Sequence, residues 1–408
     1  GVKYMNQEYV KGNPIFTNIN KVPRQFPYLT DDIDTDVIIV GGGVTGCICA
    51  YYLAKNNIKS VILEKGRIAH GSTSVTTSLL QYELDDNLID LTEVMTLKDA
   101  LKAYNLCTSA LEELDTFIEL YGNKCDYAKR DTLLYTANKL EVKAIKEEYN
   151  LRKENGFDVE YIDESTNPFS FDLKSGLIAK NGGRELDPYK YSHHLIDVSL
   201  KNGLQVYENT EVKKVDLSND KVTAEVSYGY KVHGKKLIVA TGYNTSLFTK
   251  RNFATKSNTF NIATKPLKNI ASWKNNILIR DNCDPYNYLR TTKDNRLIIG
   301  GEDVSFDDIE NETLANEKYD ILEQRLKSMF KDIKDIEVEY KYCGCFASTL
   351  DNLGFIGPDN KNNNLWYCLG YGANGILFAI LGGIMLSELY LGKQNKNMKL
   401  FKVDRFDK

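Results

Sequence analysis

Three glycines near the start of the chain have the spacing that a dinucleotide phosphate requires. Gly41, Gly43 and Gly46 form a GxGxxG sequence between an apolar run at 36–40 and a helical pattern. The first glycine of such a turn permits a tight bend, the second lets a pyrophosphate approach the backbone, and the third lets helix and strand pack closely. The helix N-terminus then offers N–H groups and a positive dipole end to the phosphates. The sequence therefore predicts a dinucleotide site here.

An acidic residue at the end of the next apolar run completes this pattern. Residues 60–63 (SVIL) are typical of a second strand, and Glu64 follows them directly. A carboxylate at this place accepts hydrogen bonds from ribose hydroxyls. Strand, glycine turn, helix, strand and acid together indicate one βαβ unit. This fingerprint alone does not separate NAD from FAD.

A second group of polar side chains alternates along a predicted strand at 286–291. Tyr286, Tyr288 and Arg290 are spaced by two residues, so their side chains share one face. Tyrosine and arginine together can bind an anionic or aromatic substrate group, and we take these three as candidate catalytic residues. The alternative is a solvated strand face with ordinary tyrosine packing.

Cysteine and histidine patterns give no sign of metal chemistry. The eight cysteines contain no CxxC spacing, so we expect free thiols in a reducing cytoplasm. His193 and His194 are adjacent, which points them to different faces of a helix, and no HxxxH or HExxH occurs. We predict no metal site and a cytoplasmic protein.

Composition excludes two further classes of function. The net charge is −4 and the lysines are interleaved with acidic residues, so we expect no nucleic acid partner. The longest apolar stretch, 375–386, is too short to span a bilayer and contains three glycines. Residues 1–35 are polar and contain Pro14, Pro23 and Pro27, so we expect no signal peptide. With 408 residues, the chain is long enough for two or three domains.

The elements that must position these groups follow from hydrophobic periodicity. We predict helices at 97–121, 138–154, 190–202, 312–330 and from about 376 to 391. We predict strands at 131–137, 205–207, 211–215, 221–226, 231–239, 277–279, 286–291, 296–300 and 337–343. This pattern indicates an α/β protein, α+β overall, in which a Rossmann-type unit adjoins a second mixed β-sheet.

The chain resembles the D-amino-acid oxidase and glycine oxidase (DAO) family of flavoproteins, and four places carry the resemblance. They are DVIIVGGGVTG with VILEKGRI, the loop 71–81 (GSTSVTTSLLQ), residues 211–212 with KKLIVATG at 235–242, and DNLGFIGP at 351–358 with LGYGANGILFA at 369–379. The resemblance implies FAD as the cofactor and a glutathione-reductase-like FAD-binding domain. A glycine-rich loop that leads into a helix also places N–H donors where an anionic reduced flavin develops charge.

Carried over residue by residue, the resemblance places the cofactor against both glycine loops. The expected FAD-binding residues are Gly41, Gly43, Val44, Thr45, Gly46, Glu64, Lys65, Ser72, Thr73, Thr77, Ser78, Leu79, Val212, Gly242, Tyr371, Gly372, Asn374, Gly375 and Ile376.

Several positions depart from the family pattern. Phe346 and Ala373 stand where glycine oxidases carry arginines that bind the substrate carboxylate, and Ile298 stands where some members place a lysine that helps oxygen react. The position at which some members attach the flavin covalently falls on Gly344, between Cys343 and Cys345, so we expect non-covalent FAD. A simple α-amino acid bound in the usual way and rapid use of oxygen are therefore both in question.

The resulting hypothesis is an FAD-dependent amine or amino-acid oxidase or dehydrogenase. Hydride transfer from the CH–NH bond to flavin would give an imine, which water hydrolyses; the acceptor is oxygen or another oxidant. The alternative is a non-catalytic, flavin-stabilised binding or assembly protein. A disulfide or pyridine-nucleotide reductase would need a CxxC and a second GxGxxG, and neither occurs. We expect an FAD-binding domain formed by 1–95, 180–245 and 340–408, and a substrate domain formed by 96–179 and 246–339.

Overall fold

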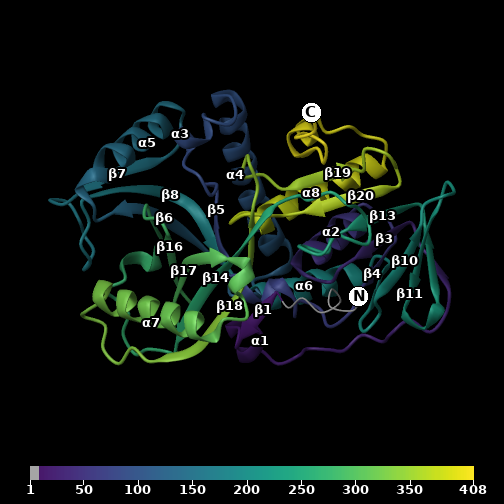
Figure 1. Ribbon diagram of the computed structural model, residues 1–408, viewed down its shortest axis with the longest axis horizontal. Coiled ribbons are helices and arrows are strands. Elements are labelled where there is room, and N and C mark those ends of the chain that lie inside the picture. Colours follow the sequence, from purple (N-terminus) through teal and green to yellow (C-terminus); the bar gives the residue numbers. More distant parts are fainter. Residues whose placement is uncertain (1–8) are drawn as a thin grey trace.

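The computed structural model describes residues 9–408, and residues 1–8 of the predicted first segment lie outside the described residues. Three sheets and the helices between them form an α/β fold. Figure 1 shows α8, β19 and β20 beside α2, β3 and β13, with the largest sheet, α5 and α7 on the other side of the molecule. The predicted fold class is confirmed.

A six-stranded sheet, in the order β19-β20-β13-β3-β4-β9, contains the glycine turn. Its strands are β3 (Val37–Val40), β4 (Ser60–Leu63), β9 (Leu204–Tyr207), β13 (Lys236–Val239), β19 (Phe355–Pro358) and β20 (Leu365–Leu369). All pairs are parallel except β19 with β20. Both β3 and β4 are buried along their whole length, as expected for parallel strands covered on both faces.

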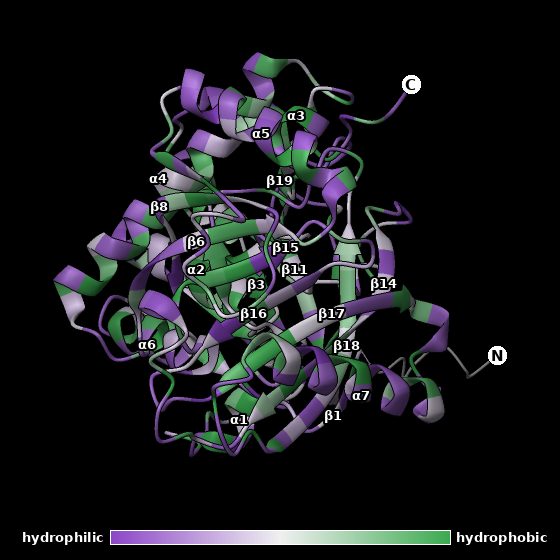
Figure 2. Ribbon diagram, turned by 90° about the vertical axis from the view of Figure 1, so that its left-hand side faces the viewer, coloured by the Kyte–Doolittle hydropathy of each residue, from purple (hydrophilic) through white to green (hydrophobic). Residues whose placement is uncertain are grey.

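Alternate residues of β3 face two different layers. Val37 and Ile39 pack in a core with the helices α2 (Val44–Lys55), α6 (Pro188–Leu200) and α8 (Gly375–Tyr390). Ile38 and Val40 face a small four-stranded sheet on the opposite side. That sheet has the order β10-β11-β12-β2 and consists of β2 (Ile33–Asp34), β10 (Val212–Asp216), β11 (Val222–Val226) and β12 (Lys231–Gly234). Figure 2 shows the hydrophobic colouring of β3 in the interior.

A ten-stranded sheet forms the second half of the molecule. Its order is β1-β18-β14-β17-β16-β15-β6-β8-β5, with β7 paired to β8. Its strands are β1 (Val10–Gly12), β5 (Leu79–Gln81), β6 (Ala128–Thr136), β7 (Val159–Asp163), β8 (Ser175–Glu185), β14 (Thr255–Thr264), β15 (Leu278–Asp281), β16 (Asn287–Thr291), β17 (Leu297–Ser305) and β18 (Val338–Ser348). Helix α7 (Glu312–Met329) packs on β14 and β17.

The two faces of this large sheet have different neighbours. Ile262 and Ile299 pack with α7, whereas Ala263, Ile298 and Tyr342 belong to the core that contains α2 and α8. We call the face that bears Ala263, Ile298 and Tyr342 the inner face.

The predicted helices correspond closely to the observed ones. The remaining helices are α1 (Ile15–Ile19), α3 (Leu88–Leu91), α4 (Leu97–Tyr121) and α5 (Val142–Glu154). The N-cap Thr96 accepts a hydrogen bond from the Asp99 amide at 3.2 Å and fixes the start of α4 at the predicted residue. No helix among residues 9–408 is long and apolar enough to cross a membrane.

The membership of four strands differs from the predicted segments. Strands β1, β5, β8 and β18 join the ten-stranded sheet, although 10–12, 79–81, 180–185 and most of 338–348 fall within the segments expected to bind FAD. Strand β18 does so because it pairs with β14 from Ser348 to Val338. The two-domain division itself stays a prediction.

Candidate active site

The glycine turn adopts the geometry that its residues predict. Gly41 has φ +113°, and a Cβ there would collide with the Ala240 carbonyl. A Cβ on Gly46 would collide with the Gly41 carbonyl, so only glycine lets α2 pack this closely on the turn. Gly43 is the N-cap of α2, and no side chain of its own caps the helix. The turn therefore presents a helix N-terminus directly after a buried parallel strand.

Glu64 lies against this turn. Its carboxylate accepts hydrogen bonds from the backbone N–H groups of Gly42 at 2.9 Å and Gly66 at 2.5 Å. Burial raises the pKa of Glu64, while the two backbone donors and Lys65 oppose that rise. The carboxylate is thus held at the end of β4, where a ribose hydroxyl would be bound.

The order of the strands brings the second glycine loop to the same edge. Strand β13 pairs with β3 on one side and β20 on the other, all parallel, so the loops that follow them meet. Tyr371, after β20, donates its hydroxyl to the Gly242 carbonyl at 2.8 Å. Gly372 has φ +76°, and Asn374 caps α8 without a side-chain hydrogen bond to the helix. Two uncapped helix N-termini therefore lie at one edge of the sheet.

All the predicted FAD residues except Val212 fall in four places. They are the turn and start of α2 (Gly41, Gly43, Val44, Thr45, Gly46), the end of β4 (Glu64, Lys65), the loop into β5 (Ser72, Thr73, Thr77, Ser78, Leu79), and the loops after β13 and β20 with the start of α8 (Gly242, Tyr371, Gly372, Asn374, Gly375, Ile376). The loop into β5 contacts the first place, because the Val44 amide donates to Thr73 Oγ1 at 3.0 Å. Val212 lies at the start of β10, beside a bulge between Val212 and Lys214.

Unpartnered buried polar atoms identify where a ligand fits. Ser78 Oγ, Thr241 Oγ1 and Asn374 Oδ1 are buried and have no hydrogen-bond partner among the described residues. All three belong to, or adjoin, the residues expected to hold the cofactor. Since leaving such groups unpaired is costly, these atoms and the two uncapped helices fit an adenine dinucleotide.

Arg290 is engaged by protein atoms at each of its nitrogens. Nε donates to its neighbour Thr291, Nη1 donates to the carbonyls of Thr77 at 2.8 Å and Leu186 at 2.9 Å, and Nη2 lies 3.2 Å from the Glu185 carboxylate. The side chain is 2% exposed. To anchor a substrate carboxylate, as the sequence suggested, Arg290 would have to break these bonds. Its geometry supports a positioning role for the loop into β5 instead.

Unlike Arg290, which is fully buried, the two tyrosines are partly exposed. Tyr288 and Arg290 lie on β16, and Tyr286 directly precedes it; both tyrosine rings are half-buried, with centroids 5.9 Å apart. The Tyr288 hydroxyl lies 2.9 Å from Thr259 Oγ1 and 3.2 Å from Asn261 Oδ1. Burial raises the pKa of both tyrosines, so they remain protonated at neutral pH.

Sequence reasoning missed two carboxyl groups near these tyrosines. Asp85 accepts a hydrogen bond from the Ala373 amide at 2.7 Å, and Asp303 lies on β17. Burial raises the pKa of each to about 6. Each also raises the pKa of Tyr286, which places all three in one neighbourhood. No motif marks these aspartates, because they come from loops and strands more than 200 residues apart.

The cysteines beside Gly344 face away from the inner face. Cys343 packs in the α7 core and Cys345 with Phe306 and Ile309, whereas Tyr342 lies in the core shared with α2. A Cβ on Gly344 would contact Val75 in the loop before β5. Strand alternation thus directs both thiols away from the expected flavin, which supports non-covalent binding. No group of three or more His, Cys, Asp or Glu residues within 9–408 forms a metal site.

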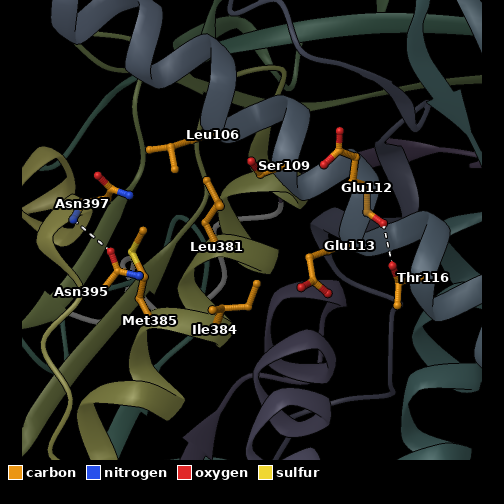
Figure 3. Close-up of a pocket in the computed structure, with 10 residues that line it drawn as sticks. All are labelled: Leu106, Ser109, Glu112, Glu113, Thr116, Leu381, Ile384, Met385, Asn395 and Asn397. Carbon is orange, nitrogen blue, oxygen red and sulfur yellow. Dashed lines mark hydrogen bonds between the residues drawn. The ribbon is translucent and has the colours of Figure 1, made fainter.

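A separate cavity of about 390 Å³ lies between α4, α8 and the C-terminal 3₁₀ turn η6 (Lys396–Phe401). Figure 3 shows its lining, in which Leu381, Ile384 and Met385 lie opposite Glu112 and Glu113. None of the predicted site residues lines it, and it has no part in the arrangement described above.

Comparison with known proteins agrees with this geometry. The family of FAD-dependent oxidoreductases called DAO matches residues 36–389. Gamma-glutamylputrescine oxidoreductase of Escherichia coli is 25% identical over 90% of this chain and 86% of its own length. Glycine oxidase of Bacillus subtilis is 22% identical over 91% of this chain and 97% of its own length. The solved glycine oxidase of Geobacillus kaustophilus superposes with a TM-score of 0.72 at 20% identity, covering 91% of this chain and 99% of that one. The chain therefore belongs to the DAO family of FAD-dependent oxidoreductases.

Proposed function

We propose that this enzyme oxidises the CH–NH bond of a small amine or amino acid and that water hydrolyses the resulting imine. The observation that carries the proposal is the pairing of an FAD-binding edge with a polar inner face in which Tyr288, Thr259 and Asn261 are hydrogen-bonded together. Bound FAD supplies the hydride acceptor. As the hydride leaves carbon, the nitrogen lone pair forms the C=N bond, so no acid–base pair is required.

The protein's own residues then have three tasks. The loop into β5 must be held in place, and Arg290 does this through Thr77. Negative charge on reduced cofactor must be stabilised, and the uncapped start of α8 supplies N–H donors for it. The substrate must be oriented with a neutral reacting nitrogen, and we assign this to Tyr286 and Tyr288, the half-buried tyrosines before and on β16.

The electron acceptor is proposed to be oxygen or another oxidant. Ile298 is fully buried on the inner face, where some relatives place a lysine that aids the oxygen reaction. We therefore expect reduced enzyme to react slowly with oxygen. The seven buried cysteines and one exposed cysteine are free thiols, which supports a reducing, cytoplasmic setting.

Anaerobic reduction tests the proposal directly. Holoenzyme is mixed with a panel of amines and amino acids, and loss of the flavin absorption is followed by stopped flow. Reduction by at least one amine, with the corresponding carbonyl product, is expected. Stable FAD binding with no reduction by any member of the panel would favour the non-catalytic alternative.

A further inference from the structure

The charges around Tyr286 and Tyr288 are unbalanced. Two arginines lie nearby, but Arg290 is paired with Glu185, and Arg280 donates to the Leu84 carbonyl at 2.8 Å and lies 3.5 Å from Glu83. Asp85 and Asp303 form no ion pair within 4.0 Å among residues 9–408. Neither carboxylate is therefore paired directly with a cation, although the charge of Arg280 lowers the pKa of Asp85 and that of Lys318 lowers the pKa of Asp303, both against the larger effect of burial.

Asp303 is directed to the inner face. Its neighbour Glu302 lies 3.8 Å from both Lys318 and Arg325 of α7, on the other side of the sheet. Thr259, which hydrogen-bonds the Tyr288 hydroxyl, also contacts Asp303 and lowers its pKa against the effect of burial. The Oδ1 atom of Asp303 is buried without a hydrogen-bond partner. An unpaired buried carboxylate oxygen is costly unless a ligand satisfies it.

A second, independent feature points to a ligand at the same place. Asn261 is 0% exposed; its Oδ1 accepts a hydrogen bond from the Tyr288 hydroxyl, and its Nδ2 donor has no partner, so this amide suits an acceptor atom of a ligand and not the cationic nitrogen itself. Gly300 makes room for this pair, because a Cβ there would collide with both the Asn261 amide and the Tyr288 ring. The side chains of Asn261 and Tyr288 thus pack directly over Gly300, with the unsatisfied amide nitrogen of Asn261 next to the Tyr288 hydroxyl.

Asp85 extends the negative charge to the loop before α8. Ala373 stands where relatives resembling glycine oxidase carry an arginine, and its amide here donates to Asp85 at 2.7 Å. The other expected arginine position holds Phe346. Both positive charges that would bind a substrate carboxylate are therefore missing, and a carboxylate takes the place of one of them.

We propose that the substrate carries a second, cationic nitrogen, as an aliphatic diamine or polyamine does, and that Asp303 binds it beside the rings of Tyr286 and Tyr288. Carboxylate oxygens and aromatic faces are the groups that bind an alkylammonium ion. The substrate carboxylate of an α-amino acid would instead meet two like charges. This inference rests on the proposed function, because it names the class of amine that the same site oxidises.

The first test compares three probes on the holoenzyme: 1,4-diaminobutane, butylamine and N-methylglycine. The diamine should reduce the flavin at the lowest half-saturating concentration. Asp303→Asn should raise that concentration by about 10- to 150-fold for the diamine, the range for a hydrogen bond to a charged group. The half-saturating concentration of butylamine should change by less than about threefold in this variant, because butylamine has no second charged nitrogen to interact with residue 303. Asp308→Asn, an exposed aspartate five residues further on, is the matched control and should behave like wild type.

The second test separates this inference from the proposed function. The bis-quaternary ion 1,4-bis(trimethylammonio)butane has no nitrogen lone pair and cannot be oxidised to an imine, so its binding is measured from the shift of the flavin band. Weaker binding to Asp303→Asn, even if no amine reduces the enzyme, would support the cation site and reject the oxidation. If amines reduce the enzyme but Asp303→Asn raises the half-saturating concentrations of the diamine and of butylamine equally, the cation site is overturned and the oxidation stands. Wild-type enzyme that does not prefer the diamine over butylamine overturns the inference without any variant.

Discussion

Replacing Arg290 by alanine distinguishes an arginine that holds the fold from one that binds substrate. The change removes the guanidinium bonds to Thr77 and Leu186 and separates the pair with Glu185. Glu185, which is 1% exposed, stays buried in this variant, but its carboxylate still accepts a hydrogen bond from Arg130 Nε at 2.6 Å. Since breaking a buried ion pair costs about 3–5 kcal/mol, and a partner remains, we expect a loss of about 2–4 kcal/mol of unfolding free energy.

FAD affinity should fall in the same variant. The loop into β5 loses the bond to the Thr77 carbonyl, and one lost hydrogen bond of about 1.4 kcal/mol corresponds to a roughly tenfold weaker affinity. Chemical denaturation, flavin content and stopped-flow reduction measure the three quantities on one preparation. Arg290→Lys should recover only part of the loss, because a single ammonium group cannot reach Glu185 and both carbonyls with the geometry of the arginine fork.

Arg296→Ala is the matched control for a buried arginine in the same sheet. Arg296 is 8% exposed, pairs with Asp294 at 2.8 Å and donates to the Thr264 carbonyl at 3.0 Å, away from the loop into β5. The Arg296→Ala protein should therefore have a lower unfolding free energy than wild type and an unchanged affinity for FAD. An Arg290→Ala protein with wild-type stability and flavin content, but a strongly raised half-saturating substrate concentration, would refute this reasoning and restore the anchor role.

Four further predictions concern the cofactor and the pH dependence. Gly43→Val should abolish FAD binding, because the branched side chain at the α2 N-cap blocks the pyrophosphate; full flavin occupancy after purification would contradict this. Glu64→Ala should weaken FAD binding by about 1.5–3 kcal/mol, measured by titrating apoprotein with FAD, and an unchanged affinity would contradict the role of this carboxylate. With a pKa of about 6, Asp303 binds a cation when ionised, so diamine affinity should be full above pH 7 and fall as pH drops through 6, a trend absent in Asp303→Asn. The raised pKa affects folding in the opposite direction. Because the folded protein binds a proton at Asp303 more readily than the unfolded chain, Asp303 should increase the free energy of unfolding as pH falls from 7 towards 4. The difference in unfolding free energy between wild type and Asp303→Asn, measured by denaturation at each pH, tests this.

Local patterns predicted those parts of the fold that local forces determine. The helix at 97–121 follows from apolar residues at helical spacing and from Thr96 as its cap, and both are present in α4. The turn at Gly41–Gly46 is largely local, because Gly41 is required by a close approach to the neighbouring strand and Gly46 by a close approach to Gly41 within the βαβ unit. The family membership was accessible for the same reason, since the matching segments are short and contiguous.

The rest depends on partners distant in sequence. Strand β14 (Thr255–Thr264) was not predicted, because its many polar residues form a strand only through pairing with β18, some 80 residues later. Arg290 was correctly placed on one face with Tyr288, but its acceptors are mainly backbone carbonyls, which no side-chain pattern reveals. Asp303 and Asp85 resemble ordinary surface aspartates until the sheet brings them to the same tyrosine.

The selectivity of this site is best understood from charges that lack a partner and not from the number of charges present. Arg280 and Arg290 would suggest an anion site if they were merely counted, yet each is already satisfied by a carboxylate and by backbone carbonyls. A substrate carboxylate would gain little from either, since it would compete with bonds that hold the loop into β5 and the 83–87 segment. Asp303 has no ion pair within 4.0 Å to give up among the described residues, and its buried, unpartnered Oδ1 would gain an interaction from a cation that reaches it. On this proposal, the same FAD-binding fold would change its preference from amino acids to diamines without moving a strand, through the loss of two arginine positions and an aspartate that forms no direct ion pair among the described residues.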